Sequence, residues 1–323
     1  MSWTASKLRL LPLALLLLAL AGPAHALGPF SHFTFGARLW PQLGPQLSPD
    51  PATRQELWPH FLAGSIALDA GYYPGAESGL AYAIHLIKPW ELTRALLAQA
   101  RTPEGKAFAL GWLSHALLDL RSHRDLVNVF TQGPFSEHKL EHKQFEWGLD
   151  AWLLAQPQGA WMWSAPLAWG PDLALWQRAV AQAHGRKVPL AVLERAMLSH
   201  YKEVKRLPYV FWLSGQIDRP GRWAGNALGW VLGHTARPLY VAWLDWRGNG
   251  MDVRAVLSAH PPSLQDLAGL KEVMALSGQD MARVLGGGPW PRGSLDADIN
   301  CATGQCPDAL KARRWLESLP PAR

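Results

Sequence analysis

The chain has 323 residues, of which 49% are hydrophobic and 17% are charged, and its formal net charge is +6. A chain of this length can bury a substantial core. The positive charge suits an anionic surface or a phosphate group, but it is too small and too scattered to indicate a nucleic-acid-binding protein. Most of the 18 tryptophans should pack in the core, although tryptophan also suits a protein that works at a lipid interface.

Residues 1–26 have the pattern of a secretory leader. Lys7 and Arg9 precede an apolar run at 10–21, which is too short to span a bilayer. The sequence Ala24-His25-Ala26 then offers a small-x-small cleavage site, and we expect cleavage after Ala26. The mature chain would be secreted or periplasmic, with a net charge of +4 after the loss of two cations. An uncleaved membrane anchor is the alternative.

The rest of the chain predicts an all-α fold with irregular loops. No long alternating strand pattern occurs, whereas apolar residues recur at helical spacing between Pro and Gly breaks. Residues 28–51 end in a Pro-rich loop, and a boundary near residue 160 would divide the helical region. We expect helices at 54–70, 90–101, 104–129, 137–154, 172–183, 189–205, 225–246 and 308–319.

The segment 104–129 carries metal-ligand side chains at a helical repeat. His115, Asp119 and His123 lie four residues apart, and each step of four drifts only about 40° around a helix. The three side chains therefore share one stripe. His142 and Glu146 repeat the spacing in the next helix. Imidazole nitrogens and carboxylate oxygens are ordinary zinc ligands, so the pattern indicates a metal site.

Three earlier residues extend this set. His32, Asp69 and His85 precede the stripe, and Gly64 and Gly111 would let two helices approach closely enough for their ligands to converge. Carboxylates can bridge two ions about 3.5–4 Å apart, an arrangement suited to in-line displacement at phosphorus.

Structural interpretations compete with the metal site. A single His/Asp pair at i, i+4 is usually a surface pair or a satisfied buried hydrogen bond. Because His115 and Asp119 lie in an apolar helix, burial without a partner would be costly, which favours a metal. We interpret Asp150 as a side chain that orients a ligand or as an acid on the helix face, rather than as a ligand, and His138 competes with His142. We interpret the other histidines as packing, capping or helix-face residues: His60, His184, His200, His234 and His260.

In their order along the chain, these motifs resemble the zinc-dependent phospholipase C family, which is related to the fungal single-strand-specific nucleases. The resemblance covers about residues 28–154. It rests on His32, a Phe61-Leu-Ala-Gly-x4-Asp69 segment, His85, the His115-x3-Asp119-x3-His123 helix and His142-x3-Glu146.

The resemblance implies an all-helical fold that holds two or three zinc ions in a catalytic core at 27–160, followed by a helical region at 161–323 of unknown role that could belong to the same domain. Asp69 would also act as the general base for the attacking water. The implied ligands are Asp69, His85, His115 and Asp119 for one zinc, His32 and the bridging Asp119 with the mature N-terminal residue for a second, and His123, His142 and Glu146 for a third.

The resemblance also implies a phosphodiester substrate, and we expect a phospholipid, with contact to a membrane surface. A nuclease-like phosphoesterase and a non-catalytic exported metal-binding protein are the alternatives. Nucleic acid is the less favoured substrate because neither a base-stacking platform nor a concentrated basic patch is visible. Cys301 and Cys306 are the only cysteines, and an oxidising compartment favours a local disulfide between them over a cysteine metal site.

Overall fold

The computed structural model describes residues 27–73, 75–133, 137–170, 172–213, 261–295 and 306–322. Within these ranges the fold is all-helical, as predicted, and no strand is present apart from an isolated bridge between Arg186 and Pro321. The helices are α2 (Pro29–Leu47), α3 (Pro51–Ala67), η1 (Leu68–Tyr72), α4 (Ser78–Leu86), α5 (Pro89–Gln99), α6 (Pro103–Ser122), η2 (His123–Val127), α7 (Asn128–Phe130), α8 (Lys139–Ala155), η3 (Pro157–Ser164), α9 (Asp172–His184), α10 (Leu190–Leu213), α14 (Leu264–Leu285) and α16 (Pro307–Ser318).

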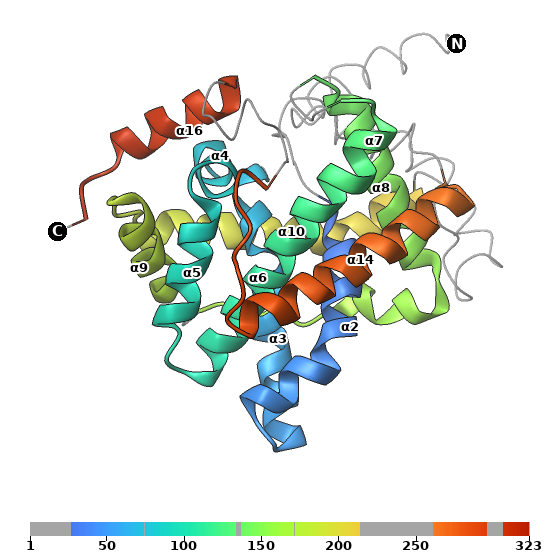
Figure 1. Ribbon diagram of the computed structural model, residues 1–323, viewed down its shortest axis with the longest axis horizontal. Helices are drawn as coiled ribbons and strands as arrows, with labels where there is room; N and C mark the ends of the chain where they lie inside the picture. The colour runs from blue at the N-terminus through green and yellow to red at the C-terminus, as the bar shows by residue number, and fades with distance from the viewer. Residues whose placement is uncertain are drawn as a thin grey trace, which may run out of the picture.

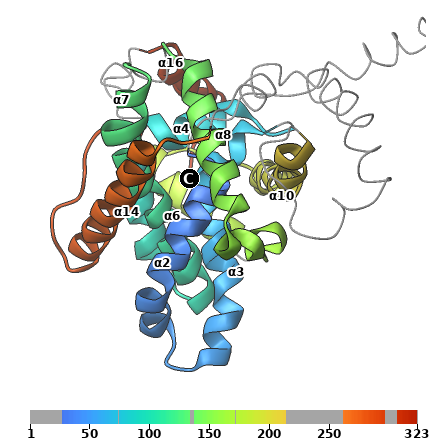
Figure 2. The same ribbon diagram turned by 90° about the vertical axis from the view of Figure 1, so that its right-hand side faces the viewer.

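Helices α2, α3 and α6 run through the middle of the molecule, with α14 on one side and α10 on the other (Figures 1 and 2). The pair α3 and α6 packs closely because each helix presents a glycine to the backbone of the other. A Cβ on Gly64 would collide with the carbonyl of Phe108, and a Cβ on Gly111 would collide with the carbonyl of Phe61. The close approach expected from the two glycines is confirmed, and it brings the ligand-bearing ends of α3 and α6 together.

Local sequence explains several helix ends. Asp50 caps α3 by accepting from the amides of Ala52 and Thr53, and Thr102 caps α6 by accepting from the amide of Gly105. Proline occupies the first turn of both helices, where its missing N–H costs nothing.

Four regions differ from the predicted elements. Residues 29–47 form helix α2, although Pro41 and Pro45 indicated a loop after the first residues. Helices α4 and α14 were not predicted, because α4 is short and mostly apolar and α14 lies in a stretch without a motif. The predicted helix at 104–129 is present but changes at His123 into a π-helical turn.

The region after residue 160 packs on the earlier helices. Helix α9 contacts α5, α10 contacts η1, and α14 contacts α6. The proposed boundary near residue 160 stays a prediction. No helix in the described ranges is long and apolar enough to cross a membrane.

Some predictions fall outside the described residues. These are the leader at 1–26, the helix at 225–246, His234, His260 and Cys301. Cys306, at the start of α16, is disulfide-bonded, in agreement with the predicted local disulfide.

Candidate metal centre

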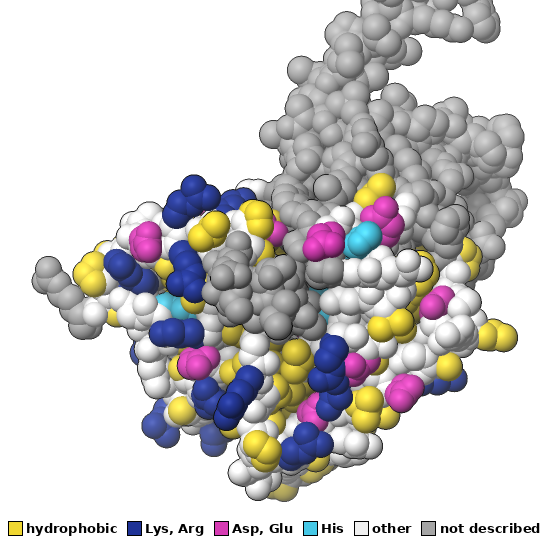
Figure 3. Space-filling view, turned by 45° about the horizontal axis from the view of Figure 1, so that its top comes forward, with side chains coloured by type: hydrophobic (Ala, Val, Ile, Leu, Met, Phe, Trp, Pro, Cys, Tyr) yellow, Lys and Arg dark blue, Asp and Glu magenta, His cyan; other side chains and the backbone are white. Residues whose placement is uncertain are grey.

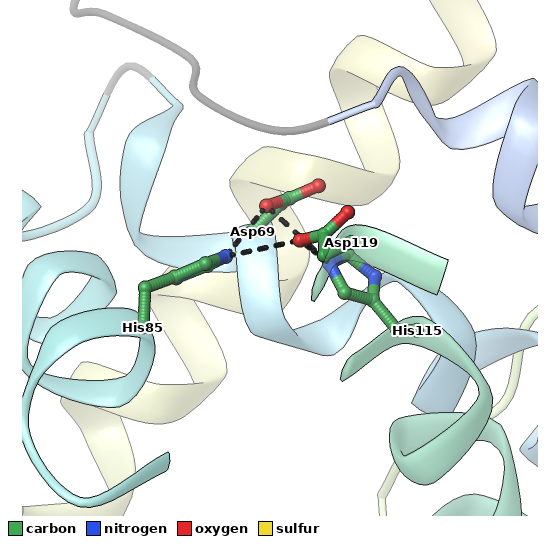
Figure 4. A group of neighbouring side chains, drawn as sticks. All are labelled: Asp69, His85, His115 and Asp119. Atoms are coloured by element: carbon green, nitrogen blue, oxygen red, sulfur yellow. Dashed lines mark hydrogen bonds and ion pairs between the residues drawn. The ribbon is translucent and has the colours of Figure 1, made fainter. Parts of the chain in front are cut away.

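Four predicted ligands from three parts of the chain form one buried cluster (Figure 4). Asp69 lies on η1 directly after α3, His85 lies at the end of α4, and His115 and Asp119 lie one turn apart on α6. Each residue offers one ligand atom, and these atoms all lie within 4.8 Å of one another. We call this group the four-residue cluster.

The distances in this cluster suit ligands that share an ion. His85 Nε2 lies 3.3 Å from Asp69 Oδ1 and 3.7 Å from Asp119 Oδ2, and His115 Nε2 lies 2.9 Å from Asp119 Oδ2. Two ligands at the usual zinc distances and a tetrahedral angle lie about 3.3 Å apart. The observed spacings bracket that value.

The other ring nitrogen of each histidine fixes the tautomer. His115 Nδ1 lies 2.7 Å from the carbonyl oxygen of Ser65, and His85 Nδ1 lies 2.9 Å from that of Ala81. Because a carbonyl oxygen only accepts, Nδ1 carries the proton and donates it. In the neutral ring Nε2 then carries a lone pair that points toward a carboxylate oxygen. Two acceptors then face each other, and either a second proton on the ring or a metal ion between them would satisfy both.

Burial and neighbouring charges set the pKa values in this cluster. Burial raises the pKa of Asp69 to about 6, against the opposite effects of His115 and His85. Burial alone would also raise the pKa of Asp119, but the imidazoles of His115 and His32 outweigh it and hold that pKa well below its usual range. The two acids on one site therefore differ in basicity, and Asp119 has the lower pKa of the two.

A second buried group, the three-residue cluster, contains His123, His142 and Glu146. His142 Nε2 lies 2.8 Å from Glu146 Oε1, one turn along α8, and His123 Nε2 lies 3.5 Å from the same oxygen. His123 Nδ1 lies 3.2 Å from the carbonyl oxygen of Leu295, so its Nε2 is again a lone pair. Burial opposes ionisation of Glu146, but His142 and His123 outweigh it and lower its pKa.

His32, the remaining predicted ligand, lies between the two clusters. Its ring stacks on that of His115 at a centroid distance of 3.6 Å, and its Nε2 lies 3.2 Å from Asp119 Oδ1. Asp119 thus turns one oxygen toward His32 and the other toward His115. Burial and His115 lower the pKa of His32 to about 4, while Asp119 and Glu146 both act to raise it. His32 and Asp119 supply two donors, so this position has fewer described ligands than the clusters on either side.

A family model described as zinc-dependent phospholipase C matches residues 31–209, more than half of the chain. The chain belongs to the zinc-dependent phospholipase C family. The match extends beyond the stretch at 28–154 that carried the resemblance and takes in α9 and most of α10. No curated protein and no solved structure matched the chain.

The donor set fits the zinc that the family name implies. Imidazole nitrogen and carboxylate oxygen are zinc ligands, and a metal-bound histidine usually donates its second ring nitrogen to a carbonyl or carboxylate. His85, His115 and His123 all do so. Both ring nitrogens of His32 are buried: Nδ1 has no hydrogen-bond partner among the described residues, and Nε2 faces Asp119 Oδ1 at 3.2 Å.

Asp150 lies next to the candidate metal centre and bonds the start of α2, the helix that carries His32. Its carboxylate accepts hydrogen bonds from the amides of Phe30 and Ser31, at 3.0 and 2.8 Å, and from the Ser31 hydroxyl at 2.7 Å. It therefore caps the first turn of α2, which carries His32, and its predicted role in orienting a ligand stays a prediction. Burial raises the pKa of Asp150 to about 7, although these donors act against the shift.

His200 is the residue that the sequence interpretation placed wrongly. We predicted a helix-face pair with Glu203, but His200 is fully buried and Glu203 instead accepts from Arg206 at 2.9 Å. The His200 ring stacks on Tyr73, with centroids 4.2 Å apart. Burial lowers its pKa well below the usual value, and the nearby imidazoles of His115 and His32 act in the same direction. His200 is thus a neutral neighbour of the metal centre.

The sequence does contain a pattern that indicates burial of His200. His200 continues an apolar stripe at helical spacing that includes Leu193, Met197, Val204 and Phe211, all of them buried. The other competing histidine, His138, lies just before α8 and belongs to neither cluster.

Proposed function

We propose that this protein is an exported zinc-dependent phosphodiesterase that hydrolyses phospholipid in the manner of a phospholipase C. Its products would be diacylglycerol and a phosphorylated head group. The observation that carries the proposal is the arrangement of His85, His115 and His123: each has Nδ1 on a backbone carbonyl and Nε2 on a carboxylate. This arrangement leaves a place for a cation in each cluster.

Zinc would be held by both clusters, and His32 with Asp119 would contribute to a third position between them. Bound zinc lowers the pKa of water and stabilises negative charge on phosphoryl oxygens. The helices contribute rigidity: His115 and Asp119 share α6, which is locked to α3 by the close contacts at Gly64 and Gly111. Ligands held in this way keep their geometry when substrate enters.

Asp69 is the best candidate for the general base. It is the one member of the four-residue cluster with any exposed side-chain area, about 4%, and its second oxygen points away from the imidazoles (Figure 4). Burial raises its pKa to about 6, near the value at which a carboxylate both stays ionised and accepts a proton readily. Asp69 would orient a water molecule and take its proton as the oxygen attacks phosphorus.

Phospholipid is favoured over nucleic acid as the substrate. The family is described as a phospholipase C. On the face shown in Figure 3, Lys and Arg side chains are spread among acidic and apolar ones, which suits loose contact with an anionic membrane surface. A nucleic-acid groove needs a continuous basic track with stacking aromatics.

Export follows from the leader pattern at 1–26, whose removal after Ala26 would expose a new amino terminus at Leu27. This amino terminus would lie five residues before His32. Cleavage is therefore part of the proposal, because the position between the clusters would gain its remaining ligands from the mature terminal residue.

The test uses the chain from Leu27, with elemental analysis for zinc and a panel of phosphatidylcholine and single-stranded DNA. We expect two or three zinc ions per chain and release of phosphocholine. Asp69→Asn should abolish at least 99% of the hydrolysis, as removal of a general base costs about 10²–10⁴-fold. Asp50→Asn is the matched control, because asparagine caps a helix as well as aspartate does.

The results separate the alternatives. Hydrolysis of DNA but not of lipid would favour the nuclease-like activity. Bound zinc without turnover of either substrate would favour the non-catalytic metal-binding protein, and absence of zinc would refute both the enzymatic and the metal-binding proposals.

A further inference from the structure

The chain after α14 turns back and runs along the molecule toward α4 (Figure 1). We call residues 289–295 the C-terminal strap. It lies outside the segment 31–209 that matches the family. Its far end is deeply buried: Ser294 and Leu295 are 2% and 0% exposed. A loop end buried to this degree must have its backbone groups satisfied by the protein.

The backbone N–H and C=O of Leu295 each form a hydrogen bond with a residue of one of the two clusters. Its N–H donates to the carbonyl oxygen of His85 at 3.1 Å. Its C=O accepts from His123 Nδ1 at 3.2 Å. His85 belongs to the four-residue cluster and His123 to the three-residue cluster. A single residue of the strap therefore joins the backbone of one ligand to the ring of another.

The Nδ1 atoms of His85, His115 and His123 each donate to a backbone carbonyl, and the three carbonyls come from different parts of the chain. His85 uses Ala81 of its own helix, and His115 uses Ser65 of α3. Only the partner of His123, among these three, comes from outside the region matched by the family model. The ring of His123 is thus held by a residue outside the segment that the family model matches.

We propose that Leu295 is a positioning residue for the zinc centre, and that the C-terminal strap completes the three-residue cluster. The carbonyl of Leu295 keeps the proton on His123 Nδ1 and leaves Nε2 for the metal. The inference rests on the proposed function, since it takes the two clusters to be zinc sites.

The strap is anchored to the helices that carry the ligands. Ahead of it, α14 is fixed to α6 by Arg121, whose Nε donates to Asp280 at 2.6 Å, and by the Ser277 hydroxyl, which donates to the carbonyl of Leu117 at 3.3 Å. Within the strap, Trp290 lies against Arg94 of α5, with the guanidinium carbon 5.4 Å from the ring centroid. Pro289 and Pro291 flank Trp290 and restrict the backbone there.

A shift of the strap would break the contact between Trp290 and Arg94 and both bonds of Leu295, although the glycines at 286–288 separate the strap from α14. Hydrogen-bond partners of metal-bound histidines typically affect metal affinity by about 10–100-fold when removed.

The test compares substitutions of Leu295 that differ in the backbone. Leu295→Ala keeps the N–H and the C=O and removes only the side chain. Leu295→Pro also removes the N–H that donates to His85, and so displaces the peptide from both histidines. Zinc affinity is measured by competition with a chelator, the Co²⁺-substituted proteins are compared by visible absorption, and the melting temperature of the zinc-free proteins reports the fold.

We expect Leu295→Pro to bind its zinc at least about tenfold more weakly than Leu295→Ala and to change the Co²⁺ spectrum. Where Leu295→Pro does not fold, Leu295→Gly replaces it: it differs from Leu295→Ala by one methyl group and loosens the backbone, and should weaken zinc binding roughly threefold relative to alanine. Equal zinc affinities within these pairs would overturn the positioning role while the zinc proposal stood. A wild-type protein without zinc would overturn the proposed function and the positioning role with it.

Discussion

The cap that Asp150 places on α2 leads to a prediction that links stability to metal content. The first turn of α2 has no side-chain cap of its own, and Asp150 on α8 supplies the acceptors for the Phe30 and Ser31 amides. Asp150 is fully buried, so water cannot replace it in these bonds. Because His32 lies in the same turn, loss of the cap should disturb both the helix end and the ligand.

The size of the effect follows from the hydrogen bonds. Asp150→Ala would leave two buried amides without acceptors, at about 1–3 kcal/mol each, so the free energy of unfolding should fall by about 2–6 kcal/mol. Asp150→Asn keeps one oxygen for Ser31 but turns an NH₂ group toward the Phe30 amide, and should cost about 1–3 kcal/mol. A loss of 1 kcal/mol lowers the melting temperature of a large domain by about 2–4 °C.

The assay is urea unfolding of the zinc-free variants combined with zinc analysis of the loaded ones. Asp172→Asn is the matched control, because Asp172 is equally buried and bonds His60 at 2.8 Å, apart from both clusters. We expect Asp150→Asn to lose part of its zinc and Asp172→Asn to keep it. Equal zinc contents in the two variants, or an Asp150→Ala protein as stable as the wild type, would refute the reasoning.

Three further predictions concern acid stability, helix packing and metal removal. Burial and Lys88 lower the pKa of His184 from 6.5 to about 4, so folding favours the neutral ring. The contribution of this ring to the free energy of unfolding, at most about 3 kcal/mol, should be complete above pH 6.5 and lost as the pH falls through 4. Denaturation curves of His184→Gln should lack this pH dependence. In Gly111→Ala the new methyl group would collide with the Phe61 carbonyl, and the variant should lose about 1–3 kcal/mol of unfolding free energy and some zinc affinity. Gly278→Ala is the control, because its nearest neighbour lies at 3.8 Å; it should unfold no more easily than the wild type and keep its zinc. Chelation should lower the melting temperature, because zinc at 1,000 times its dissociation constant stabilises the fold by about 4 kcal/mol; an unchanged calorimetric transition would contradict this.

The side chains of the candidate site could be predicted because ligand chemistry leaves a local signature. The i, i+4 spacing of His115/Asp119 and of His142/Glu146 survives in the structure as ligand pairs on α6 and α8. The all-α class followed equally directly from helical periodicity. Helix α2 was missed because prolines usually end a helix, yet this one continues through Pro41 and Pro45.

The backbone contacts could not be predicted. The carbonyls of Ser65 and Leu295 fix two imidazole rings, but a carbonyl is present at every residue and leaves no trace in the sequence. The partner of His123 lies 172 residues away along the chain. His200 was missed for a different reason: its apolar stripe was visible, but the local spacing to Glu203 was given more weight than the helical face.

The contacts of His115 require a positive charge beside its Nε2, and Asp119 and Asp69 accordingly act to raise the pKa of this imidazole. Both of its nitrogens face acceptors, the Ser65 carbonyl at 2.7 Å and Asp119 Oδ2 at 2.9 Å. A neutral imidazole has one proton and can satisfy only one of them, so either a second proton or a metal ion must fill the other contact. A second proton would create buried charge pairs whose desolvation commonly offsets their attraction. A zinc ion meets the same need and can satisfy several acceptors at once, including Asp69 and His85, which a single proton on His115 cannot do.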